Sequence, residues 1–156
     1  MKRIDLDRLP DVGGSSYPPP YDDPCRTRIR KRLGRAGGLT QFGVNRLTLP
    51  PGGWSSQRHW HSHEDEFVFV VEGEVVLITD AGEETLAAGE CVAFKAGDAD
   101  GHHLVNRSDR DAVVLEVGND YPARDRCVYP DIDMIAEPGE DHYRRREGTP
   151  YAKVER

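Results

Sequence analysis

The sequence has no long apolar run and little cysteine. No segment approaches the roughly 18 apolar residues of a membrane-spanning helix, and the opening MKRIDLDRLPDVGG lacks the apolar stretch of a signal peptide. The three cysteines, Cys25, Cys91 and Cys127, lie far apart without CxxC spacing, which argues against a disulfide framework and a thiolate metal site. We therefore expect a cytoplasmic protein with free thiols and no membrane partner.

Basic residues are also in the minority. The chain has 21 Lys and Arg against 28 Asp and Glu, a formal net charge of −7, so nucleic acid is not an expected partner. The exception is residues 26–35, where six of ten positions are basic and none is aromatic. We expect these charges to face solvent or to pair with the chain's own carboxylates, and the alternative is a site for a phosphate or an acidic partner chain.

Composition divides the 156 residues into three parts of a single domain. Residues 1–38 are rich in proline, glycine and charge and predict an extended N-terminal arm. Residues 39–118 contain short β-branched and aromatic runs and predict the folded core. Residues 119–156 lose this alternation and predict an irregular C-terminal extension that packs on the core or on a partner subunit.

The core has the pattern of an all-β domain. Its runs are separated by Gly, Pro, Asp and Asn and show no sustained 3.6-residue periodicity. Many short strands at even spacing predict a sandwich or a barrel. The predicted strands are 40–49, 57–61, 66–71, 74–79, 84–86, 91–94, 102–106 and 112–117.

One group of residues in this core has the chemistry of a metal site. His59 and His61 are two positions apart, so on a strand both imidazoles point to the same face. Glu66 opens the next strand, and antiparallel pairing could bring its carboxylate beside them. A strand beginning at His102 could supply a fourth donor if the barrel closes.

The spacing of these residues resembles the cupin family. Gly53, His59, His61, Glu66 and Gly73 match every fixed position of the first cupin motif. The resemblance covers roughly residues 39–118. The sequence of this region is similar to that of a group of bacterial single-domain cupins.

The second cupin motif is matched in part. Gly89, Gly97, His102 and Asn106 occupy its positions, whereas Lys95 stands where the pattern has proline. Four residues instead of two separate Gly97 from His102, while the three-residue gap from His102 to Asn106 is kept. This gap favours His102 as the fourth ligand.

Three other residues remain alternatives as ligands. The strict gap after Gly97 would select Asp100, and His103 is adjacent to His102 but points to the other face if alternation holds. His63 shares strand parity with His61, but the chain must turn before Glu66, so we expect His63 in the loop.

The resemblance implies an all-β, double-stranded β-helix (jelly-roll) barrel around one divalent transition metal. The implied ligands are His59, His61, Glu66 and His102, and the metal could be Fe, Mn, Zn, Ni or Cu. We expect a small-molecule metalloenzyme of the dioxygenase, isomerase or lyase type. The alternatives are a non-catalytic metabolite-binding or sensor protein and a metal that only stabilises the fold.

Alternation also predicts which side chains face inward. If it holds, five residues line an apolar interior: Val68, Val70, Cys91, Ala93 and Leu104. Phe67, Phe69 and Val71 then form an apolar outer face that must be covered by a second sheet or by a subunit interface. A homodimer formed through this face is the expected assembly.

Overall fold

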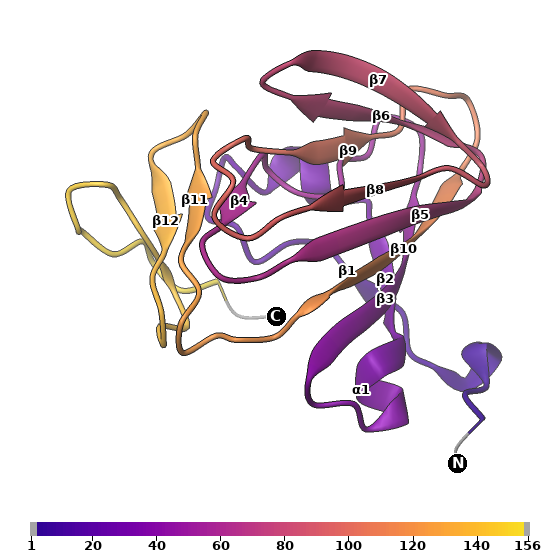
Figure 1. Ribbon diagram of the computed structural model, residues 1–156, viewed down its shortest axis with the longest axis horizontal. Coiled ribbons are helices and arrows are strands. Elements are labelled where there is room, and N and C mark those ends of the chain that lie inside the picture. Colours follow the sequence, from indigo (N-terminus) through magenta and orange to yellow (C-terminus); the bar gives the residue numbers. More distant parts are fainter. Residues whose placement is uncertain (1–2, 155–156) are drawn as a thin grey trace.

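A computed structural model describes residues 3–154 of the chain (Figure 1). Short strands dominate, and the described helices are one short α-helix and two 3-10 turns, Leu6–Arg8 and Asp23–Cys25. The elements are β1 (Val12–Gly13), β2 (Ile29–Arg32), α1 (Leu33–Gly37), β3 (Phe42–Leu49), β4 (Trp60–His61), β5 (Glu66–Glu72), β6 (Glu74–Thr79), β7 (Gly82–Ala87), β8 (Cys91–Phe94), β9 (His103–Val105), β10 (Ala112–Asn119), β11 (Cys127–Tyr129), β12 (Met134–Ala136) and β13 (Tyr143–Arg144). The all-β prediction is confirmed.

Residues 3–154 contain three antiparallel sheets. A six-stranded sheet has the order β1-β2-β3-β10-β5-β8, and a three-stranded sheet, β7-β6-β9, lies across it (Figure 1). The apolar core between them consists of Leu47, Leu49, Val68, Val70, Val75, Leu77, Leu86, Leu104, Ala112 and Val114. The β5–β6 turn passes through Gly73, whose φ of +74° is a left-handed conformation that favours glycine.

Alternation along β5 holds, but the prediction for β8 is wrong. Val68 and Val70 are buried, whereas Phe67 and Phe69 are 39% and 36% exposed. Cys91 and Ala93, predicted to face the interior, are exposed because they pair directly with Phe69 and Phe67 and so share their outer face. Val92 and Phe94 are the β8 residues that pack against the core.

The strand predicted at 57–61 is shorter in the structure. Only Trp60 and His61 form a regular strand, β4, which pairs with β11 of the C-terminal extension. Upstream, His59 forms an isolated bridge with His102. The segment from Ser55 to Gln57 is buried but belongs to no strand. Its polar groups bond to the Arg28 side chain, to the Tyr21 carbonyl oxygen and to the backbone of Leu104 in β9.

The N-terminal segment contributes to the main sheet. β2 pairs with β3 over four residues, and β1 pairs with β2. Most of the basic run lies here, and several of its charges have intramolecular ion pairs: Arg26 with Asp22 and Asp23, Arg30 with Glu116, and Lys31 with Asp11.

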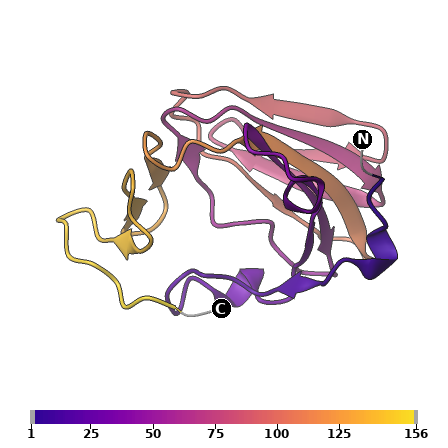
Figure 2. The ribbon, with the colours of Figure 1, turned by 90° about the horizontal axis from the view of Figure 1, so that it is seen from below.

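The C-terminal segment forms the third sheet, β13-β12-β11-β4. A second apolar cluster joins it to the N-terminal segment, with Tyr17 and Cys25 on one side and Cys127, Tyr129 and Met134 on the other. Figure 2 shows the indigo N-terminal segment and the yellow C-terminal segment approaching each other beside the main sheet. The two segments together therefore form one wall of the molecule.

Within residues 3–154, no helix is both long enough and apolar enough to span a membrane.

Candidate metal centre

The two motif regions meet at one end of the sheets. His61 ends β4 and His59 directly precedes that strand, Glu66 is the first residue of β5, and His102 immediately precedes β9. Two backbone hydrogen bonds join the regions, from His59 N to His102 O (3.1 Å) and from His102 N to His59 O (2.8 Å). This bridge brings histidines that are 43 positions apart in the sequence to the same site.

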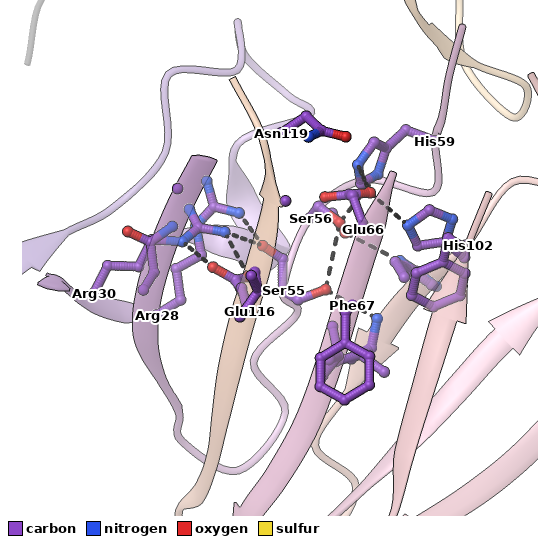
Figure 3. A pocket seen from close by; sticks show the side chains of 18 of the residues that line it. Arg28, Arg30, Ser55, Ser56, His59, Glu66, Phe67, His102, Glu116 and Asn119 are labelled. Carbon is purple, nitrogen blue, oxygen red and sulfur yellow. Dashed lines mark hydrogen bonds and ion pairs between the residues drawn. The ribbon is translucent and has the colours of Figure 1, made fainter. Parts of the chain in front are cut away.

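Three histidine side chains converge on one carboxylate oxygen, and Figure 3 shows two of them, His59 and His102, beside Glu66. Glu66 Oε2 lies 2.9 Å from His102 Nε2, 3.6 Å from His59 Nε2 and 3.7 Å from His61 Nε2. The ligand atoms of His59, Glu66 and His102 all lie within 4.8 Å of one another, and His61 joins this group through Glu66.

Contacts to the other ring nitrogens favour this orientation. His59 Nδ1 lies 2.9 Å from the carbonyl oxygen of Gln57, and His61 Nδ1 lies 2.6 Å from Asp125 Oδ2. A proton held at Nδ1 leaves the Nε2 lone pair available to a metal. The His102 ring stacks on Phe94 with centroids 3.4 Å apart, and its buried Nδ1 has no hydrogen-bond partner among residues 3–154.

The ionisation of the cluster suits a cation. Burial acts to raise the pKa of Glu66, but interactions with His102 and His59 outweigh it and hold this pKa well below its usual range. Burial lowers the pKa of His102, which favours the neutral imidazole. Burial also acts to lower the pKa of His61, but hydrogen bonds, first to Asp125, raise it to about 11, so His61 must lose a proton before it binds a metal.

The donor set therefore fits a divalent transition metal. Three imidazole nitrogens and one ionised carboxylate are typical ligands of Fe, Mn, Ni, Cu or Zn, and they lie around a shared, largely buried point.

Comparisons with known proteins agree with this fold. The family model described as "Cupin domain" matches residues 45–118. A solved structure from Silicibacter pomeroyi DSS-3, described as a sugar phosphate isomerase from a cupin superfamily, is 42% identical, with 97% of each chain covered and a TM-score of 0.90. This chain belongs to the cupin superfamily. The predicted family and jelly-roll fold class are thereby confirmed.

Two further structures are more distant. A proposed sugar phosphate isomerase from Acidithiobacillus ferrooxidans is 27% identical, covers 83% of this cupin and 81% of its own chain, and has a TM-score of 0.70. A polyketide cyclase from Streptomyces resistomycificus is 20% identical over 76% and 79% of the two chains, with a TM-score of 0.59, and shares the fold. A comparison with curated proteins gave no significant match.

The three alternative ligands lie outside the group around Glu66. His63 is exposed in the loop before β5, with Nδ1 2.9 Å from Ser62 Oγ. His103 is buried against Trp54, and its Nδ1 bonds to the carbonyl oxygen of Ser56 at 3.0 Å. Asp100 accepts a hydrogen bond from the Asp80 backbone instead.

The C-terminal segment places residues at the site that the sequence did not indicate. Asp125 holds His61, and Cys127 forms a potential ligand group with His59 and His61 whose ligand atoms lie within 4.8 Å of one another. Tyr129 stacks against His59, with the ring centroids 5.7 Å apart. No local pattern identifies these residues, because the β11–β4 pairing that brings them here joins segments more than 60 positions apart.

A cavity of about 300 Å³ opens beside the cluster (Figure 3). His59, Glu66 and His102 line one part of its wall, and Arg28 and Arg30 line another. This volume is at the lower end of the range of small-molecule sites.

Proposed function

We propose that this cupin is a metal-dependent enzyme that isomerises a small, oxygen-bearing metabolite. The observation that carries the proposal is the convergence of three Nε2 atoms on Glu66 Oε2 at the wall of a cavity. His59, His61, Glu66 and His102 would hold the metal. When bound, the metal would supply a Lewis acid for a substrate carbonyl or hydroxyl oxygen.

The similarity to the Silicibacter pomeroyi sugar phosphate isomerase favours isomerisation over the dioxygenase and lyase types. The cavity wall supports a polar substrate, because it includes the side chains of Asn45, Asn119 and Ser16 beside the metal cluster. These polar side chains would orient the substrate in the cavity, and the cavity wall would limit the substrate's exposure to water.

The proposal includes a cytoplasmic homodimer. Phe67, Phe69 and Val71 are each more than one-third exposed on the outer face of β5, and β5 lies between β10 and β8 in the main sheet. A second copy of the chain would cover these apolar side chains.

Elemental analysis of protein purified without a metal-affinity tag tests the metal site. We expect near-stoichiometric metal in the wild type and in His63→Ala and His103→Ala, and loss of metal in His59→Ala, His61→Ala, Glu66→Ala and His102→Ala. Absence of metal after reconstitution with each candidate ion would refute the proposal.

An isomerase assay on a panel of aldose and ketose phosphates tests the reaction. Interconversion that is lost in Glu66→Ala and in chelator-treated protein is the expected result. Stoichiometric metal and ligand binding without turnover would instead indicate the non-catalytic metabolite-binding protein.

A further inference from the structure

A buried guanidinium lies on the wall of the cavity that the proposed metal ligands also line. Arg28 is 3% exposed, and both it and Arg30 line the cavity together with His59, Glu66 and His102 (Figure 3). Arg28, directly before β2, and Arg30, within β2, thus face the proposed substrate site.

The two arginines differ in how their charge is balanced. Arg30 forms a bidentate ion pair with Glu116. Its Nε donates to Oε2 at 2.9 Å and its Nη2 donates to Oε1 at 3.0 Å. Arg28 donates from Nε to the carbonyl oxygen of Gly14 and from Nη1 to that of Ser55, and no described carboxylate forms an ion pair with it. Two positive charges therefore face one negative charge at this part of the wall.

A buried charge without a counter-charge is costly. An arginine stays protonated in a protein, so Arg28 cannot avoid this cost by losing its proton. Carbonyl oxygens orient the guanidinium but do not neutralise it, and none of the described hydrogen bonds uses Nη2. An anion in the cavity would supply both the missing charge and the missing acceptor.

The residues Ser55 and Ser56 connect the two arginines to the proposed metal ligands. The carbonyl oxygen of Ser55 accepts from both Arg28 and Arg30. The next residue, Ser56, places its Oγ 3.3 Å from Nδ1 of His59. Ser55 and Ser56 both line the cavity, between the arginines and the histidines.

We propose that Arg28 binds an anionic group of the substrate, a phosphate or a carboxylate, while the substrate's hydroxyl or carbonyl oxygens face the metal cluster. The substrate class is then an anionic, oxygen-rich small molecule. This inference rests on the proposed function only in taking the cavity as the substrate site, since anion binding at Arg28 needs no metal.

Calorimetric titration of metal-free protein with inorganic phosphate, methyl phosphate and acetate tests the inference. We expect wild-type protein to bind at least one of these anions and Arg28→Met to bind it about tenfold or more weakly, the effect of losing a charge-assisted hydrogen bond. Binding of methyl phosphate alone would identify a phosphate ester, and binding of acetate alone a carboxylate. Arg26→Met, which removes an exposed charge from the same segment, should bind like the wild type.

Metal content separates this inference from the proposed function. Arg28→Met should keep its metal, whereas chelator-treated wild-type protein should lose its metal and still bind the anion. Equal anion affinity in the wild type and Arg28→Met, or no anion binding by the wild type, would overturn the inference whatever the metal content.

A second measurement covers the case in which Arg28→Met does not fold. Wild-type crystals soaked in tungstate, an electron-dense analogue of phosphate, should show anomalous density against the Arg28 guanidinium. Density confined to other sites, or none, would overturn the inference.

Discussion

The Nδ1 atom of His61 is hydrogen-bonded to a residue from a distant part of the chain. Asp125 Oδ2 lies 2.6 Å from His61 Nδ1, and the same carboxylate accepts from the His63 backbone at 2.8 Å. Asp125 therefore acts as a positioning residue: it directs Nε2 of His61 toward Glu66 and raises the basicity of the ring.

Asp125→Asn should weaken metal binding. The neutral amide cannot polarise the His61 ring, so we expect about 10- to 100-fold lower metal affinity, measured by competition with a chromophoric chelator. The visible spectrum of the cobalt-substituted protein should change as well, which a purely structural role would not cause. Asp109→Asn, at a side chain that is 93% exposed, is the control and should bind metal like the wild type.

Phe94 sets the plane of the His102 ring. The two rings are nearly parallel, at 3° and 3.4 Å between centroids, and Phe94 also packs against the apolar core. Because Phe94 is only partly buried, Phe94→Ala should lower the free energy of unfolding by about 2–3 kcal/mol, less than a fully buried phenylalanine would.

Urea denaturation and metal titration together check this prediction. The loosened His102 ring should also lower metal affinity. Phe42→Ala, at a phenylalanine that is 41% exposed, should change the unfolding free energy by about 0.5 kcal/mol or less. A Phe94→Ala protein with unchanged metal affinity would show that the stacking does not orient His102.

At the scale of elements, the loop before β9 fits closely against the segment after β11. A methyl group at Gly101 would lie 2.8 Å from Cγ of Pro130, closer than packed atoms allow. Gly101 directly precedes His102, so this contact connects the position of a proposed metal ligand to the C-terminal segment.

Gly101→Ala should therefore displace His102. Overpacking of this kind costs about 1–3 kcal/mol of stability, and metal affinity should fall with it. Thermal unfolding with and without metal measures both effects. Gly13→Ala adds the same methyl group where the nearest atom is 3.9 Å away, and its stability and metal affinity should match the wild type.

At the scale of the whole molecule, the outer face of the main sheet predicts a dimer. Phe69 pairs with Leu115 on one side and with Cys91 on the other, so apolar residues continue across three strands. Phe69→Glu would place a charge in the centre of this face, and light scattering after size exclusion should show a shift from dimer to monomer. A monomeric wild type, or equal dissociation in Thr85→Glu on the exposed strand β7, would contradict the prediction.

The main apolar core contains none of the proposed metal ligands. Chelation should therefore remove the metal and leave the far-ultraviolet circular dichroism unchanged, with a lower melting temperature because a ligand of the native state is lost. Chelator-induced unfolding would instead indicate a purely structural metal.

Local patterns were sufficient for much of this protein. Strand alternation depends only on neighbouring residues, so it correctly assigned Val68 and Val70 to the core and Phe67 and Phe69 to the surface. The spacing from Gly53 to Gly73 resembles the first cupin motif, and this resemblance predicted the cupin fold. It also selected His59 and Glu66, whose side chains the structure brings together.

Contacts between distant segments were decided by tertiary structure alone. Cys91 and Ala93 were misassigned because the register of β8 against β5, and not the local sequence, determines which face they share. Asp125 contacts His61 only because β11 pairs with β4, and Arg28 lines the cavity next to the metal cluster only because β2 joins the main sheet beside β3. The sequence predicted the fold and the proposed metal ligands through strand alternation and the resemblance to the cupin motifs. The residues that contact those proposed ligands, and the charges on the cavity wall, depend instead on how strands far apart in the chain pair.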